Sequence, residues 1–272
     1  MRLLNTHFDP DLPYWRDYLP WLSQLAGHEF PGCDQLNRLL PGGLVSAAGQ
    51  HIRFVPSTRL DDEAYELRVH ESGQVSTRPD NWHDLFNALV WMRYPRIKTA
   101  MNKLHYGAWS EQGNGRRGPL RDALTLFDEC GVIVYSDQPE LLVSVAERRW
   151  KDVFLNTDFN TRVQLSVCGH AMLEKFLSPY RSMTAKALLV QVEPELLKRP
   201  REEVLNLLDQ VVARRMLDGE VLTRPACLAP LPLAGVPGWW PLEQQADITF
   251  YADLDVFRPP PRGLLAAPVI QV

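Results

Sequence analysis

The pattern of apolar and polar positions predicts a chain with more helix than strand. Apolar residues recur at helical spacing in many segments, whereas alternation or short apolar runs mark only a few strands. Helices are expected over residues 15–25, 36–40, 120–130, 139–154, 169–177 and 202–217. Strands are expected over 52–56, 132–135, 163–167 and 187–192, with an edge strand over 248–251. The segment 120–130 also fits a hairpin, although its spacing favours the helix.

The strands are short and their order is mixed, so the pattern predicts an α+β fold. Residues 65–69 and 74–77 alternate in polarity on either side of Gly73, which predicts a β-hairpin. Residues 225–272 are rich in Pro and Gly but keep apolar side chains, so we expect them to wrap the body. The prediction is a mainly helical single domain over residues 1–272, with short mixed strands and a helical edge over residues 1–50.

Residues 81–105 form the stretch around which the rest is organised, because apolar residues are dense there and polar residues recur at helical spacing. An N-cap at Asp80 or Asn81 begins a helix that ends near residue 93. Pro95 ends this helix or starts a second one, which we expect to stop at Gly107. Helices joined so closely usually pack side by side, so we expect a helical hairpin with converging polar faces.

Composition and charge narrow the classes of function. The 272 residues are 45% hydrophobic and carry a net charge of -4, so nucleic acid is not an expected partner. The first residues lack the apolar core of a secretion signal, and no run approaches the roughly 18 apolar residues that a spanning helix needs. The 4 cysteines are widely spaced without a C-x-x-C pair, which favours reduced thiols. These features predict a soluble cytoplasmic protein without a membrane span.

Polar residues suited to catalysis or metal binding fall at helical spacing in four segments. They are His83 with Asn87; Lys98 with Asn102 and His105; Asp122 with Thr125 and Glu129, next to Asp128; and His170 with Glu174. If these faces converge, they form a polar pocket that could bind a divalent metal and activate a water. The alternative is structural, with His83 and Asp122 at helix starts and the amides tying helices together. No H-E-x-x-H or P-loop sequence occurs.

Two other features could contact a ligand. Arg116, Arg117 and Arg121 form a compact basic cluster that could meet a phosphate, although such loops are more often simply solvated. Trp239 and Trp240 could stack on a ligand, but aromatic residues in a Pro/Gly-rich segment usually cover the edge of a core.

The sequence also resembles a known family. The resemblance is carried by N-W-H-D-L-F-N-A-L-V-W, P-R-I-K, N-K-L-H, R-D-A-L-T-L-F-D-E-C-G, G-H-A-M-L-E-K, G-V-P-G-W-W and F-Y-A-D-L-D-V-F-R-P. These runs look like the blocks of a bacterial family, found mainly in proteobacteria, called domain of unknown function 3025 (DUF3025). The resemblance covers nearly the whole chain and implies no activity, substrate or cofactor. It implies that the family signature falls on His83, Asp84, Asn87, Lys98, Asn102, His105, Asp122, Asp128, Glu129, His170 and Glu174.

Two functions are consistent with these residues. The first is an enzyme, a hydrolase or lyase of a small polar substrate, with one concave pocket. In it, His83, Asp84, Asn87, Lys98, Asn102, His105, Asp122 and Glu129 would be catalytic, and His170, Glu174 and Asp128 would hold a divalent metal. The second is a non-catalytic binding or scaffold protein, whose polar residues tie helices together. This hypothesis predicts a large exposed apolar patch near Trp239 and no deep polar pocket.

Overall fold

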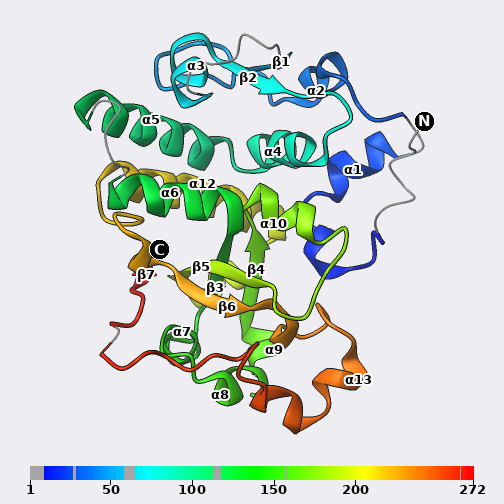
Figure 1. The fold of residues 1–272 in the computed structure, drawn as a ribbon, viewed down its shortest axis with the longest axis vertical. Coiled ribbons are helices and arrows are strands. Elements are labelled where there is room, and N and C mark those ends of the chain that lie inside the picture. The colour runs from blue at the N-terminus through cyan, green and yellow to red at the C-terminus, as the bar shows by residue number, and fades with distance from the viewer. Residues whose placement is uncertain (1–8, 27–28, 58–64, 113–117, 157, 264) are drawn as a thin grey trace.

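A mixed sheet of five strands lies at the centre of the part of the chain that the computed structural model describes, residues 9–26, 29–57, 65–112, 118–156, 158–263 and 265–272 (Figure 1). β3 (Gly131–Ser136) and β5 (Thr184–Gln191) pair in parallel, and β4 (Val163–Val167) pairs antiparallel with β3. On the other side of β5, β6 (Ala229–Pro232) pairs antiparallel with its first half and β7 (Val269–Gln271) pairs parallel with its last residues. The strands predicted over residues 132–135, 163–167 and 187–192 are therefore confirmed.

Helices cover this sheet. β3 is buried at every position, as its apolar run predicts for a strand covered on both faces. α6 (Pro119–Cys130) and α7 (Pro139–Ala146) both pack against β3 and β5. Figure 1 shows α6 and α12 (Arg201–Leu217) above the sheet, with α7 and α8 (Trp150–Phe154) below it. The short helices α9 (Phe159–Arg162), α10 (His170–Lys175) and α11 (Pro194–Leu197) connect these layers.

The single helix predicted over residues 139–154 is wrong, because the chain breaks between α7 and α8. Arg148 has a φ of 56°, in the left-handed region that a continuous α-helix excludes. The N–H of Arg149 returns to the carbonyl of Ser144 at 2.9 Å, which closes the end of α7. Trp150 then starts α8.

The predicted helical hairpin is also wrong. α4 (Trp82–Arg93) and α5 (Pro95–Gln112) follow one another end to end in Figure 1. α5 packs along α12 instead. The buried Asp209 of α12 accepts from the N–H groups of Arg96 and Ile97 at 3.1 and 2.9 Å, so α12 supplies the cap that holds the start of α5. α5 also continues past Gly107 to Gln112, since one glycine inside a helix costs only about 1 kcal/mol.

Residues 65–72 form a helix rather than half of the predicted β-hairpin. α3 (Tyr65–Ser72) connects β1 (Arg53–Pro56) to β2 (Gln74–Thr77), which pair in parallel. Gly73 has a φ of 68°, and its N–H bonds to the carbonyl of Val69 at 3.0 Å. This glycine therefore ends a helix instead of turning a hairpin.

The two terminal regions pack onto the core. The N-terminal elements are η2 (Pro13–Trp15), α1 (Leu19–Leu25) and α2 (Cys33–Leu39), and the hydroxyl of Tyr18 donates to the carbonyl of Val167 at 2.6 Å. The C-terminal segment contains η3 (Pro225–Cys227), η4 (Leu233–Gly235), α13 (Leu242–Gln245) and η5 (Ile248–Ala252), besides β6 and β7. Residues 248–251 are thus a 3-10 helix and not the predicted edge strand, because Asp247 caps the N–H of Thr249 at 2.8 Å.

Trp239 and Trp150 show how the C-terminal segment is held. The Trp239 ring meets the rings of Tyr14 and Phe176 edge to face, with centroids 5.7 and 5.5 Å apart. The indole N–H of Trp150 donates to the carbonyl of Arg258 at 2.8 Å. Residues 225–272 therefore wrap the body and cover the edge of its core.

The predicted fold class is confirmed: the chain is an α+β domain with one continuous hydrophobic core. All four cysteines are free thiols. Among the described residues, none of the helices combines the length and the apolar character needed to cross a membrane.

Candidate functional site

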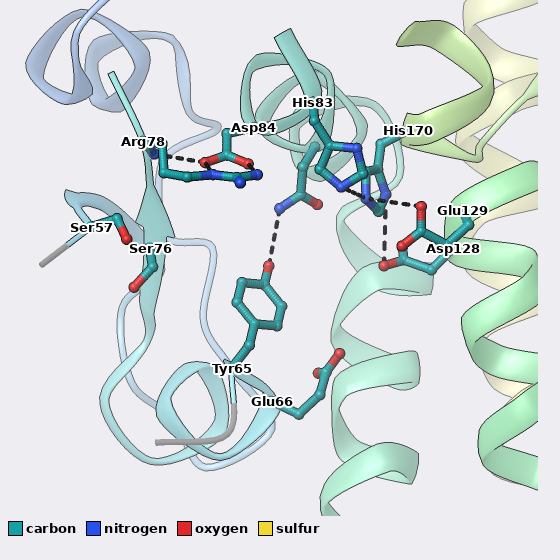
Figure 2. Close-up of a pocket in the computed structure, with 11 residues that line it drawn as sticks. Ser57, Tyr65, Glu66, Ser76, Arg78, His83, Asp84, Asp128, Glu129 and His170 are labelled. Carbon is teal, nitrogen blue, oxygen red and sulfur yellow. Dashed lines mark hydrogen bonds and ion pairs between the residues drawn. The ribbon is translucent and has the colours of Figure 1, made fainter. Parts of the chain in front are cut away.

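A polar cavity of about 340 Å³ lies where α3 and β2 face α4, α6 and α10 (Figure 2). Its lining residues are Ser57, Tyr65, Glu66, Ser76, Arg78, His83, Asp84, Asn87, Asp128, Glu129 and His170. A cavity of this volume, with several convergent polar groups, has the size and character of a small-molecule site.

Two histidines meet at one side of this cavity. His83 is the second residue of α4 and His170 is the first residue of α10, two helices that pack against each other. Their Nε2 atoms lie 2.9 Å apart, and the ring planes make an angle of 77°. His170 is 5% exposed, whereas the side chain of His83 is 30% exposed. The ring of His170 is therefore buried, and the ring of His83 reaches the cavity.

Three carboxylates surround this pair. Glu174 Oε2 lies 3.0 Å from His83 Nδ1, and Asp128 Oδ2 lies 3.7 Å from His170 Nδ1. Glu129 Oε2 lies on the other side, 3.7 Å from His170 Nε2. One ligand atom from each of His83, Glu129 and His170 lies within 4.8 Å of the other two, so these three residues could hold one metal ion.

The orientation of the two rings constrains where their hydrogens lie. A neutral imidazole carries one hydrogen, and a carboxylate facing Nδ1 favours the tautomer with that hydrogen on Nδ1. Glu174 faces the Nδ1 of His83 in this way at 3.0 Å, whereas Asp128 lies 3.7 Å from the Nδ1 of His170, which has no hydrogen-bond partner. If His170 also carries its hydrogen on Nδ1, beside the Asp128 charge, both Nε2 atoms present lone pairs to each other at 2.9 Å, which is repulsive. A shared cation, either an additional proton or a metal ion, removes this repulsion.

The end of α6 is held directly against the start of α10, and this contact places His170. The N–H groups of Cys168 and Gly169 both donate to the carbonyl of Gly131, at 3.0 and 2.8 Å. A Cβ on Gly169 would lie 2.4 Å from the backbone nitrogen of Gly131, so only glycine allows this approach. The contact brings His170 beside the last turn of α6, which carries Asp128 and Glu129.

A chain of hydrogen bonds centred on the buried Lys98 supports Asp128. Lys98 Nζ donates to Asp128 Oδ1 at 2.6 Å and to Asn87 Oδ1 at 2.9 Å, and Asn87 Nδ2 donates to the hydroxyl of Tyr65 at 3.0 Å. Burial tends to raise the pKa of Asp128, but the Lys98 ammonium and His170 lower it far below its ordinary value. Burial tends to lower the pKa of Lys98, and Asp128 outweighs this effect and raises it. Asp128 therefore stays ionised beside His170.

Arg78 closes another side of the cavity. Its guanidinium donates to both carboxylate oxygens of Asp84, at 3.0 and 2.7 Å, and its backbone N–H donates to the same side chain at 2.6 Å. The backbone N–H of Asp84 donates to the side-chain oxygen of Asn81, the predicted N-cap of α4. Asp84 therefore fixes the residue after β2 to the first turn of α4 (Figure 2).

Residues 52–261 match a family model described as "Protein of unknown function (DUF3025)". The match spans well over half of the chain and includes every residue of the cavity. The chain belongs to the DUF3025 family. No curated protein and no solved structure matched the chain. The family assignment confirms the resemblance seen in the sequence, and the function must be argued from the chemistry of the cavity.

The structure brings most of the predicted site residues together. His83, Asp84, Asn87, Lys98, Asp128, Glu129, His170 and Glu174 line the cavity or contact its lining residues directly. Their arrangement differs from the predicted roles. Glu174 and Asp128, predicted as metal ligands, lie against the Nδ1 atoms, whereas Glu129, predicted as catalytic, lies with the two Nε2 atoms.

A further predicted site residue, Asn102, is buried and donates to the backbone and side-chain oxygens of the lining residue Glu66, at 2.8 and 2.7 Å. Two of the predicted site residues lie elsewhere. His105 lines a separate cavity, because α5 continues away from α4 instead of folding back beside it. Asp122 is exposed on the first turn of α6 and lines neither cavity. Arg116 and Arg117 lie outside the described residues.

Sequence reasoning missed Tyr65, Glu66 and Arg78. Tyr65 and Glu66 were assigned to a strand, which hid the fact that both sit at the start of a helix facing α4 and α5. The helix-forming residues after Tyr65 could have indicated this. The sequence signal for Arg78 was weaker, because it consists only of a cation six residues before the carboxylate of Asp84.

Proposed function

We propose that this protein is a metal-dependent hydrolase of a small polar substrate, with His83, His170 and Glu129 as the metal ligands. The observation that carries the proposal is the facing pair of Nε2 atoms, 2.9 Å apart, with a carboxylate beside each Nδ1. A metal ion at this position would satisfy both lone pairs at once. It would also leave the Nδ1–H of His83 free to donate to Glu174.

The donor set fits a catalytic rather than a structural metal. Two imidazoles and one carboxylate form a ligand set used by zinc hydrolases, which keep further coordination positions for water or substrate. Histidine ligands usually donate their second N–H to a carboxylate or carbonyl, which fixes the ring and increases its basicity. Glu174 is placed to accept this hydrogen from His83 at 3.0 Å, and the Asp128 carboxylate lies 3.7 Å from the Nδ1 of His170. A bound metal of this kind would supply an activated water and polarise the bond under attack.

The remaining lining residues suit proton transfer and substrate orientation. Burial raises the pKa of Tyr65, although Lys98 opposes this effect, so its hydroxyl stays protonated. That oxygen accepts from Asn87, which leaves the hydroxyl hydrogen free to point toward a substrate. Asp84 is held by Arg78. The carboxylate of Glu66 is bonded by Asn102 at Oε2, so its other oxygen can accept a proton from water.

Metal dependence of activity tests the proposal. Metal-free protein would be prepared by chelation, reconstituted with Zn²⁺ or Mn²⁺, and assayed on a panel of small carboxylic esters, amides and phosphate esters. We expect hydrolysis of at least one class to fall by about 100-fold or more without metal and to return on reconstitution. Glu129→Gln and His170→Ala should remain inactive after reconstitution.

Asp122→Asn is the matched control, because Asp122 is an exposed carboxylate on the same helix as Glu129. It should keep full activity. Hydrolysis that is equal in metal-free and reconstituted protein would contradict the proposal. Elimination rather than hydrolysis on metal-loaded protein would identify a lyase using the same ligands.

A further inference from the structure

A second cavity, of about 310 Å³, lies beside the first and shares two lining residues with it, Tyr65 and Glu66. The other residues that line it are Leu67 of α3, His105, Tyr106 and Trp109 of α5, and Arg121 and Thr125 of α6. Two candidate site residues of the sequence analysis, His105 and Arg121, therefore meet here, away from the histidine pair.

Aromatic residues line the α5 side of this second cavity. The ring of Tyr106 stacks on His70, with centroids 3.8 Å apart and planes inclined by 10°, so it is held in place. Trp109 lies three residues further along α5, on a neighbouring part of the same helical face. Such aromatic surfaces favour a planar, unsaturated group over a small aliphatic one.

Arg121 supplies a positive charge that nothing in the described chain neutralises. Its Nε is buried without a hydrogen-bond partner, and its guanidinium forms no hydrogen bond or ion pair with another described residue. A guanidinium presents a planar fork of donors that matches a carboxylate. Thr125 lies one turn later on α6, so its hydroxyl faces the same space. An unpaired buried N–H is costly, and a ligand oxygen would satisfy it.

His105 adds a neutral donor and acceptor. It is 8% exposed, and no hydrogen bond joins its ring to another described residue. Burial lowers the pKa of His105, with Arg121 and Lys98 acting in the same direction and Glu66 and Asp128 opposing. The Glu66 carboxylate is engaged by Asn102 at the wall between the cavities. Arg121 is thus the positive charge that a ligand meets within this cavity, and the Glu66 carboxylate lies at the wall shared with the first cavity.

We propose that the second cavity binds a planar aromatic ring that carries a carboxylate. The ring lies against Tyr106 and Trp109, and the carboxylate bonds to Arg121. Because Tyr65 and Glu66 line both cavities, this aromatic acid is the far end of the substrate whose other end reaches the histidine pair. This last step rests on the proposed function, whereas the binding of an aromatic acid does not.

Calorimetric titration of metal-free protein with benzoate tests the binding directly. Benzoate should bind one site per chain in about the millimolar range, the affinity expected of so small a ligand. Benzamide keeps the ring without the charge, and acetate keeps the charge without the ring. Both should bind at least about tenfold more weakly, since each lacks one of the two recognised features.

Variants locate the bound benzoate. Arg121→Gln should weaken binding at least about tenfold, and Trp109→Leu should also weaken it. Arg199→Gln is the matched control, because Arg199 is exposed and lines neither cavity, and it should change nothing. If Arg121→Gln unfolds, Arg121→Lys serves instead, since it keeps the charge but loses the planar fork.

The outcomes separate this proposal from the proposed function. Absence of benzoate binding, or equal binding by the Arg121 variant, overturns the aromatic-acid site even if the protein holds a metal. Benzoate binding by a protein that never retains metal would establish this site and remove the hydrolase proposal. Retention of benzoate binding in His83→Ala is expected, because His83 does not line this cavity.

Discussion

Lys98 links the polar side chains that lie behind the histidine pair. It is 4% exposed and is the donor to both Asp128 and Asn87. Lys98→Met keeps the length of the side chain but leaves an ionised carboxylate without its partner. We expect the free energy of unfolding to fall by about 3–5 kcal/mol, measured by urea denaturation.

The double variant Lys98→Met with Asp128→Asn provides the control for this prediction. Removing the charge of Asp128 should recover part of the lost stability, because the cost comes from leaving a buried charge unpaired. If Lys98→Met alone costs less than about 1 kcal/mol, the ion pair does not stabilise the fold as described.

His105 makes stability depend on pH. Burial lowers its pKa in the folded protein below that of the unfolded chain, so the unfolded state binds more protons between these two values. The free energy of unfolding should therefore decrease as pH falls below about 6.5, the ordinary histidine value. His105→Gln cannot titrate and should lose less stability than the wild type between pH 7.5 and 5.0. Equal losses, measured by urea denaturation at both pH values, would show that His105 is not responsible.

The sequence could identify site residues whose chemical type and helical spacing together indicate a shared polar face. His83 with Asn87 and His170 with Glu174 were found because they lie one turn apart on helices that form as predicted. Which atom of each ring faces which carboxylate could not be predicted, because it depends on how α4, α6 and α10 pack. In the proposed metal centre, Glu129 takes the ligand role that the sequence suggested for Glu174, because that packing places Glu129 beside both Nε2 atoms.

At the scale of elements, the contact between α6 and α10 positions the site. Gly169→Ala should disrupt it, because the added Cβ would meet backbone atoms of Cys130 and Gly131 at 2.6 and 2.4 Å. We expect a loss of about 1–3 kcal/mol in the free energy of unfolding, together with weaker metal binding as His170 moves away from Glu129.

Gly107→Ala is the matched control for this substitution. Gly107 lies inside α5, and an added Cβ would meet nothing within 4 Å. Alanine should therefore stabilise the protein by about 0.5–1 kcal/mol without affecting metal binding. Similar thermal stability of the two variants would contradict the proposed tight approach at Gly169.

Local signals predicted individual elements well and their partners poorly. Asn81 marked the start of α4, and the V-I-V-Y run marked β3. The error at α3 arose because residues 65–69 fit an alternating strand as well as a helix, and only the long-range pairing of β1 with β2 decides between them. The break at Arg148 has no signal in its residue type.

At the scale of the whole molecule, the two helices of the 81–105 stretch lie end to end, and this separates two cavities. A side-by-side hairpin would have placed His105 opposite His83. Instead Asp209 of α12 caps the start of α5, and α5 packs along α12. His105 therefore lies with Arg121 in the second cavity, and His170 lies beside His83. The organising stretch was therefore recognised from sequence, but its tertiary partners were not, because α12 lies about a hundred residues further along the chain.

The most direct test of the account is the metal content of protein purified without a metal-affinity tag, measured by elemental analysis. We predict close to one zinc, manganese or iron ion per chain, lost in His83→Ala and in His170→Ala while both variants remain folded. His51→Ala, which alters an exposed histidine outside the cavity, should keep the metal. A wild-type protein without metal, together with histidine variants that lose only stability, would contradict the metal centre and make the His83–His170 pair a structural contact.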